Sequence, residues 1–346
     1  MSATPEATIS IPSPVSALSL GPNDTLCVGS EDGSLRWYNL PSARVVKAAK
    51  SLGAEIASIT WQLSKKNEPV AIWIACGRRV ICLPADLQKM IATADDASAS
   101  LEVGEDDDDV LNEARILSIS ENGRHLAFTS DSGSVGTIDL ASHVITRMKS
   151  RHNTVCGSVK FIPDRPSELV SGGYDSALLH FDVGQGTILS RFDISAPPPS
   201  EGVSLSPPFV LSVTVSSTGL LAAGTADGRA WIGGGGEKRP SSKKKRSRKW
   251  EGLKEDEGIW LQVADGPVVS SAFTASDRLF TCSLLGTIAE YKVIRDDDGS
   301  LRATKGWSAV APTLEKVNAM TASHSWVVIG GFGKDGRGIV QVFHVT

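Results

Sequence analysis

The residues whose spacing most closely matches a chemical motif are Gly331, Gly333 and Gly336, which fit the GxGxxG pattern of dinucleotide-binding loops. Such a loop needs a strand before it and a helix after it, because the helix N-terminus holds the pyrophosphate. Residues 338–345 (GIVQVFHV) instead show the alternation of residue types that is typical of a strand. The sequence therefore predicts a turn between two strands here, not a nucleotide site.

Residue types that bind metals or act as nucleophiles occur without the spacing that those roles require. The histidines are His125, His143, His152, His180, His324 and His344. The cysteines are Cys27, Cys76, Cys82, Cys156 and Cys282. An odd cysteine count without a CxxC pair predicts buried free thiols rather than a zinc site or a disulfide framework, which is typical of a reducing compartment. GxSxG and Walker A patterns are also missing, so we expect no enzyme, no cofactor and no metal site.

A basic run lies within a Gly/Lys/Arg-rich stretch, residues 233–258, that we interpret as an inserted loop with a flexible glycine lead-in. Its cations are Lys243, Lys244, Lys245, Arg246, Arg248 and Lys249. Short runs of this kind indicate nuclear localisation or nucleic-acid contact. We favour binding to an import receptor, with phosphate-backbone contact and simple solubility as the alternatives.

A second inserted loop, residues 91–113, carries the acidic run 105–109 (EDDDD). Like charges in sequence repel one another and favour a solvated surface loop, with docking of a basic partner as the alternative. The whole chain has a formal net charge of -4, which argues against nucleic-acid binding over the whole surface. We expect no secretory signal and no membrane span, because the chain lacks both a basic, apolar leader and an apolar run of about 18 residues.

The elements that would position these residues are copies of one repeated unit. Each copy reads as a strand, a polar turn, a second strand, a Gly/Asp turn and a third strand. The copies span residues 14–40, 55–83, 114–140, 154–183, 210–234, 267–293 and 316–345. The aspartate of the second turn recurs as Asp32, Asp131, Asp175, Asp227 and Asp335. Such an aspartate ties a tight turn through local side-chain-to-backbone bonds.

The first strands of these copies are 39 to 60 residues apart, and the shorter spacings fit the WD-repeat period of about 40–45 residues. The pattern resembles the WD-repeat family, with Tyr38-Asn39, Ile138-Asp139 and Phe181-Asp182 at the place of its Trp-Asp dipeptide. The resemblance implies an all-β fold, a seven-bladed β-propeller formed by residues 1–346 as a single domain. The last copy has only three strands, so we expect residues 6–11 (EATISI) to complete its blade and to close the ring by pairing the N- and C-terminal segments.

The fourth copy also resembles the polar network inside blades of this family. The resemblance places His152 in the loop before the blade, Ser171 on the second strand and Asp175 in the turn. Phe181 stands where the family usually has a tryptophan, so the network would lack its last donor.

Function is expected to be non-catalytic: a scaffold that holds other proteins, nuclear or cytoplasmic. Its partner surface would include Arg78, Arg79 and Tyr174, because Arg and Tyr often anchor interfaces. Residues 112–194 are most similar to a family member proposed as a substrate receptor of a cullin-RING ubiquitin ligase, which implies a ligase adaptor as partner. The alternative is a nuclear scaffold in ribosome biogenesis or chromatin that contacts RNA or DNA through the basic run.

Overall fold

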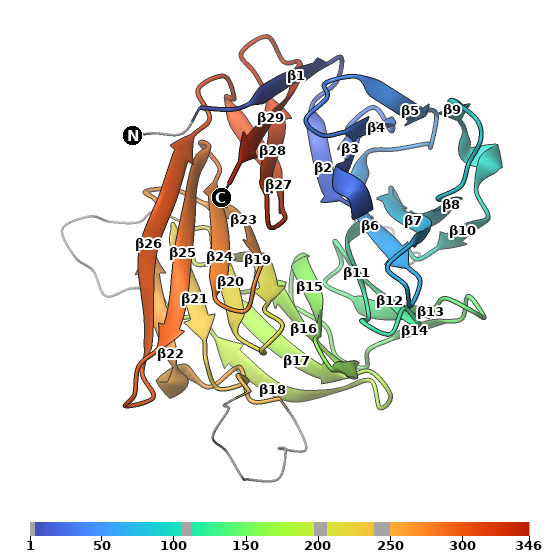
Figure 1. The fold of residues 1–346 in the computed structure, drawn as a ribbon. Helices are drawn as coiled ribbons and strands as arrows, with labels where there is room; N and C mark the ends of the chain where they lie inside the picture. The colour runs from blue at the N-terminus through green and yellow to red at the C-terminus, as the bar shows by residue number, and fades with distance from the viewer. Residues whose placement is uncertain (1–3, 105–112, 197–205, 239–249, 346) are drawn as a thin grey trace.

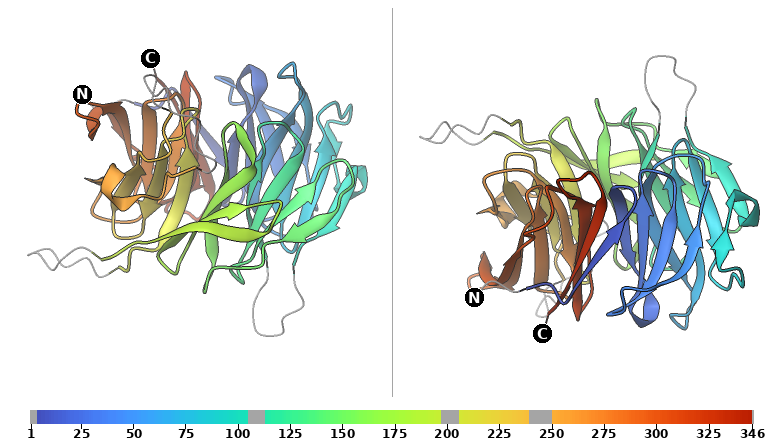
Figure 2. Two further views of the ribbon diagram at one scale, coloured as in Figure 1. Left: turned by 90° about the horizontal axis from the view of Figure 1, so that it is seen from below. Right: turned by 90° about the horizontal axis from the view of Figure 1, so that it is seen from above.

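The structure is a computed structural model that describes residues 4–104, 113–196, 206–238 and 250–345. Seven sheets, each built on four antiparallel strands, stand around a central axis like the blades of a propeller (Figure 1). Figure 2 shows the same ring from two sides, as a flat disc. The seven-bladed all-β fold predicted from the repeats is confirmed.

Each blade is named by its order along the chain and begins with the strand nearest the axis. The innermost strands of blades one to seven are β2 (Val15–Leu20), β6 (Ile56–Leu63), β11 (Ala114–Ile119), β15 (Cys156–Ile162), β19 (Val210–Val215), β23 (Val268–Phe273) and β27 (Lys316–Ala322). The second strands are β3 (Thr25–Ser30), β7 (Pro69–Cys76), β12 (His125–Ser130), β16 (Arg165–Gly173), β20 (Leu221–Thr225), β24 (Arg278–Ser283) and β28 (Trp326–Phe332).

The outer half of each blade is built from its third and fourth strands. The third strands are β4 (Leu35–Asn39), β8 (Arg79–Pro84), β13 (Val135–Asp139), β17 (Ala177–Asp182), β21 (Arg229–Gly233), β25 (Thr287–Arg295) and β29 (Gly338–His344). The outermost strands are β5 (Val45–Ala49), β10 (Ala99–Glu102), β14 (Ile145–Arg147), β18 (Thr187–Asp193), β22 (Gly258–Gln262), β26 (Leu301–Val310) and β1 (Ala7–Ile11). Three short 3-10 turns are η1 (Pro22–Asp24), η2 (Ala94–Asp96) and η3 (Glu255–Glu257).

Ring closure uses the segment expected from the sequence. Strand β1 pairs antiparallel with β29, with Ile9 opposite Val340 and Ile11 opposite Gly338. Figure 1 shows this first strand lying beside the last one. Ile9 and Ile11 are buried in the cluster between blades seven and one, so closure adds apolar packing to the backbone pairs.

The core is divided among the blade interfaces. Seven hydrophobic clusters each fill the space between two neighbouring blades. This division follows from the strand pattern, because a sheet with apolar residues on both faces must be covered on both. All five cysteines are buried and free, as the sequence predicts.

The stretch 91–113 differs from the expected acidic loop. Its first part contains β9 (Ile91–Ala92), η2 and β10, and β10 is the outermost strand of blade two. After β8 the chain crosses to blade one, where β9 pairs parallel with β5, and then returns. This excursion accounts for the long spacing between the second and third copies. The acidic run 105–109 itself lies outside the described residues.

The stretch 233–258 differs as well, because its glycines pack against aromatic rings. A side chain added at Gly236 or Gly252 would overlap the Trp250 indole, and one at Gly233 would meet Trp231. These glycines are therefore needed for close approach, not as a flexible lead-in. The basic run Lys243–Lys249 lies outside the described residues.

Candidate interaction surfaces

The turns between second and third strands all lie on one side of the ring, which we call the turn face (residues 31–34, 77–78, 131–134, 174–176, 226–228, 284–286 and 333–337). The connections into each innermost strand lie on this same side, because neighbouring strands in a blade are antiparallel. The turn aspartates predicted from the repeats, Asp32, Asp131, Asp175, Asp227 and Asp335, are all on this face.

Four of these aspartates make local bonds. Asp32 accepts from the Ser34 hydroxyl and main-chain N–H, and Asp131 pairs with Arg115. Asp227 accepts from Thr225 and from Arg229. Exposed Asp335 accepts the Arg337 main-chain N–H at 3.1 Å, and its carboxylate lies 3.8 Å from Arg337 Nε.

Asp175 differs because it reaches a histidine from the preceding connection. His152 Nδ1 lies 2.8 Å from Asp175 Oδ1, and His152 Nε2 lies 2.8 Å from Ser171 Oγ. Asp175 Oδ2 also accepts the main-chain N–H of Asn153 at 3.0 Å. The structure therefore brings together His152, Ser171 and Asp175, the three residues that the family resemblance assigned to one network.

Burial and hydrogen bonding together set the pKa values of His152 and Asp175 in this network. Burial opposes the charged imidazole, but the hydrogen bond with the Asp175 carboxylate and its negative charge favour it, so the pKa of His152 is raised to about 9. Burial likewise opposes the Asp175 carboxylate, but the hydrogen bonds from His152 and the Asn153 N–H lower its pKa. The side chain of His152 is fully buried, so the pair stabilises the turn and is not itself a contact surface.

Arg78, Arg79 and Tyr174 lie on the turn face but do not form one cluster. Arg78 and Arg79 belong to blade two, where Arg78 Nε pairs with Glu102 at 3.2 Å. Tyr174 belongs to blade four and stacks on Phe209 of blade five, with ring centroids 5.8 Å apart. Tyr174 thus packs on the neighbouring blade, while part of its ring remains exposed.

A second buried network in blade four was not foreseen. Glu168 Oε2 accepts hydrogen bonds from His180 Nε2 (2.9 Å) and from the main-chain N–H of Trp250 (3.0 Å), and Glu168 Oε1 accepts from Arg165 (2.7 Å). Burial would raise the pKa of Glu168, but these donors lower it to about 2. Strand alternation indicates that Glu168 and His180 share a face, but nothing in the sequence points to Trp250.

The residues that flank the basic run are anchored on the side opposite the turn face. The main-chain N–H of Lys238 donates to the Thr218 carbonyl (2.8 Å), and its ammonium pairs with Asp164. The Trp250 indole donates to the Gly219 carbonyl at 3.0 Å. Lys238 and Trp250, the described residues on either side of residues 239–249, therefore lie beside turns between first and second strands.

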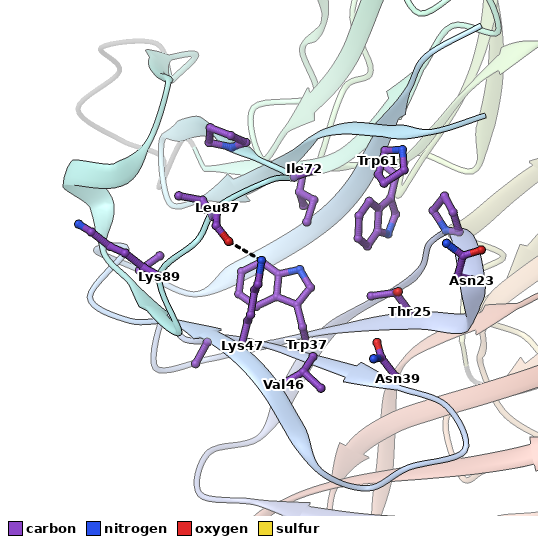
Figure 3. Close-up of a pocket in the computed structure, with 16 residues that line it drawn as sticks. Asn23, Thr25, Trp37, Asn39, Val46, Lys47, Trp61, Ile72, Leu87 and Lys89 are labelled. Carbon is purple, nitrogen blue, oxygen red and sulfur yellow. Dashed lines mark hydrogen bonds between the residues drawn. The ribbon is translucent and has the colours of Figure 1, made fainter. Parts of the chain in front are cut away.

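A pocket of about 320 Å³ lies between blades one and two (Figure 3). Trp37, Val46 and Trp61 contribute apolar surface to its lining, and Ile72 and Leu87 add to it. Figure 3 shows Lys47 reaching toward the Leu87 carbonyl, to which its ammonium donates. The other lining residues are Pro22, Asn23, Thr25, Asn39, Ala48, Pro69, Pro84, Ala85, Lys89 and Ala92.

Exposed apolar side chains occur on the elements that form this pocket. Nine large apolar side chains are exposed in the part of the chain that the structure describes, and five of them belong to blades one and two or to the excursion between these blades. The five are Val45, Leu63, Val70, Met90 and Ile91. Met90 and Ile91 lie on the excursion that closes the outer side of the pocket, with Ile91 opposite Ala48 in the β5–β9 pair. We call the pocket together with Met90 and Ile91, which adjoin the lining residues Lys89 and Ala92, the blade one–two surface. No pattern of the repeats points to it, because it depends on the excursion.

Metal-binding groups and membrane-spanning helices are both absent from the residues that the structure describes. No group of three His, Cys, Asp or Glu side chains within the described ranges could hold a metal ion. Across the same ranges, every helix is too short or too polar to span a bilayer.

No protein-family model matches the chain. Among solved structures, it is similar to a chain in a crystal structure of the mitotic checkpoint complex, with a TM-score of 0.68 and 15% identity, over 99% of this chain and 92% of that one. The narrower resemblance of residues 112–194 to WD repeat-containing protein 53 is not supported. At this identity the similarity shows the fold alone, which is a seven-bladed β-propeller.

Proposed function

We propose that this chain is a non-catalytic protein-interaction scaffold that binds a partner through the blade one–two surface. The observation that carries the proposal is the tryptophan-lined pocket with the exposed apolar side chains of Met90 and Ile91 beside it. Exposed apolar groups that gather around a concave site are typical of binding surfaces, whereas single scattered ones are ordinary. Trp is also a residue type that often dominates interface energetics.

The partner class follows from the chemistry of the pocket. Trp37 and Trp61 offer aromatic surface to an apolar side chain, and a volume of about 320 Å³ accommodates one such anchor. Met90 and Ile91 lie beside it and extend the contact along an exposed strand. We therefore expect a protein segment with an apolar anchor residue, not a small polar substrate.

The experiment is an affinity purification with quantitative mass spectrometry on Met90→Lys/Ile91→Lys and on a matched control, Leu285→Lys/Val310→Lys. The exposed fractions are 66% and 56% for Met90 and Ile91, and 67% and 52% for Leu285 and Val310. Partners of the wild-type chain should be lost from the first variant and kept by the control. Equal recovery from both variants, with both folded, would contradict the proposal.

A finer role, substrate receptor in a cullin-RING ubiquitin ligase, follows only from the resemblance of residues 112–194, which the comparisons do not support. The Arg of the family's Trp-Asp-X-Arg adaptor box is replaced at all three candidate places, by Pro41, Ala141 and Gly184. Recovery of a cullin and its adaptor in the same purification tests this role directly.

A nuclear scaffold with RNA or DNA contact is the second candidate, favoured by the basic run and by the anchoring of its flanks through Lys238 and Trp250. Changing Lys244, Lys245 and Arg246 to Ala should move a fluorescent fusion from nucleus to cytoplasm if the run binds an import receptor. If the run contacts phosphates, localisation should stay and the salt dependence of RNA binding should flatten.

A further inference from the structure

The innermost strands bond to one another from blade to blade around a central channel. Ser158 Oγ accepts the Val213 N–H at 2.9 Å, and Ser58 Oγ accepts the Leu117 N–H at 3.1 Å. A second level of such bonds uses the hydroxyls of Ser118, Thr214 and Thr321, which accept the N–H groups of Phe161, Phe273 and Leu20. Hydroxyl side chains thus satisfy backbone donors that face the channel.

One position in this second level is different. Each innermost strand has a register shift near its start, and the fourth residue after the last paired residue before that shift is equivalent in all blades. In blade order these residues are Ser19, Thr60, Ser118, Lys160, Thr214, Ala272 and Thr321. Blade four therefore carries a cation where five blades carry a hydroxyl and one carries alanine.

Lys160 has no counter-charge in its surroundings. The channel has a volume of about 370 Å³, and Lys160 is the one charged residue among the described residues that line it. Its ammonium makes no hydrogen bond or ion pair with the described part of the chain. Burial lowers the pKa of Lys160, which is the expected effect of removing an ammonium from water without a partner.

A lysine also breaks the pattern of bonds at its level. Serine and threonine can accept a main-chain N–H, whereas an ammonium only donates. Lys160 therefore gives up a blade-to-blade acceptor and places three N–H donors beside the channel. Ser19 and Thr60 line the same channel at the same level and offer further hydroxyl donors.

We propose that the central channel binds a small oxyanion, a phosphate or a carboxylate, which pairs with the Lys160 ammonium. The channel is large enough for such an anion, and its hydroxyl lining supplies donors for the remaining oxygens. This site is separate from the blade one–two surface, so either proposal can fail without the other.

The test is isothermal titration of inorganic phosphate, and separately of succinate, into the whole chain at fixed ionic strength set with chloride. Holding ionic strength fixed removes general screening from the comparison. At least one of the two anions should bind the wild-type chain at a single site. Lys160→Met should weaken that binding about tenfold or more, because the charge-assisted bonds are lost, whereas Lys160→Arg should keep it within a few fold.

Two further variants test whether a loss of binding comes from misfolding or from the removal of any nearby cation. Lys160→Thr introduces the residue found at the equivalent positions 60, 214 and 321, so it should fold, melt at or above the wild-type temperature and bind neither anion. Lys149→Thr removes an exposed cation from the connection between blades three and four and should leave binding unchanged. The proposal is overturned if neither anion binds the wild-type chain, or if the folded Met and Thr variants at position 160 bind as tightly as the wild type.

Discussion

The main-chain N–H of Trp250 donates a hydrogen bond to Glu168 Oε2 at 3.0 Å, across a separation of 82 residues. This bond joins the long β21–β22 connection of blade five to the second strand of blade four. The same oxygen accepts from His180, whose ring meets the Trp250 indole edge-on at 5.3 Å. The bond fixes the residue that directly follows the basic run.

Glu168→Gln should lower the free energy of unfolding by about 1–3 kcal/mol. The carboxylate accepts at both oxygens, whereas an amide replaces one acceptor with a donor and leaves a buried donor unpaired. Urea unfolding measures the change. The matched control is Glu102→Gln, which loses an exposed ion pair with Arg78 and should change stability by no more than about 1 kcal/mol. Equal losses would show that the Glu168 network has no special role.

The buried His152 predicts a fall in stability at alkaline pH. Its pKa is raised to about 9 in the folded chain, above the value of about 6.5 expected when unfolded. The stabilisation from its charged form is therefore complete below pH 6.5 and is lost as the pH rises from there toward 9. We expect a loss of about 1–3 kcal/mol over this window, at 1.36 kcal/mol per pKa unit.

Urea unfolding of the wild-type chain and His152→Gln at several pH values between 6 and 9.5 checks this expectation. The difference in free energy of unfolding between the two should shrink as the pH rises. A difference that stays constant would mean that His152 is neutral throughout.

The turn aspartates should differ in their effect on stability. Asp175→Ala removes the acceptor for both His152 and the Asn153 N–H and should destabilise the fold by about 1–3 kcal/mol. Asp335→Ala removes one bond at an exposed site and should change stability by about 0.5 kcal/mol or less. Thermal melts of the two variants decide the point, and similar melting temperatures would argue against a special network in blade four.

Ring closure predicts that the first strand is essential for stability. Deleting residues 1–12 removes β1, its backbone pairs with β29 and the burial of Ile9 and Ile11. The loss should be at least about 3 kcal/mol, from apolar area at about 25 cal/mol per Å² and the lost pairs. Deleting residues 1–4, which precede the strand, is the control and should leave the melting temperature unchanged. A stable 1–12 deletion would mean that the ring closes without β1.

The strands could be predicted because their signals are local. Apolar residues that alternate with polar ones, followed by a Gly/Asp turn, identify a blade from the sequence alone. The innermost strands accordingly begin within two residues of the expected positions. The turn residue Asp175 and its partner His152 followed from the resemblance of the same repeat to a known family.

The remaining features depend on contacts that have no local pattern. Ile91–Ala92 is too short to show alternation, so the excursion to blade one was read as a loop, and the pocket that it borders was missed. The Glu168–Trp250 bond joins segments of two different blades. Lys160 stands out only when the seven innermost strands are aligned by their register shifts.

The central claim, that a partner docks on the blade one–two surface, is tested most directly by site-specific photo-crosslinking in cells. A photoreactive amino acid replaces Met90 in one variant and Leu285 in another, two positions of nearly equal exposure (66% and 67%). Position 90 should form a discrete crosslinked species with another polypeptide, and position 285 should form none with that polypeptide. If position 90 yields no crosslink, or the same species arises equally from both positions, the account of this surface is contradicted.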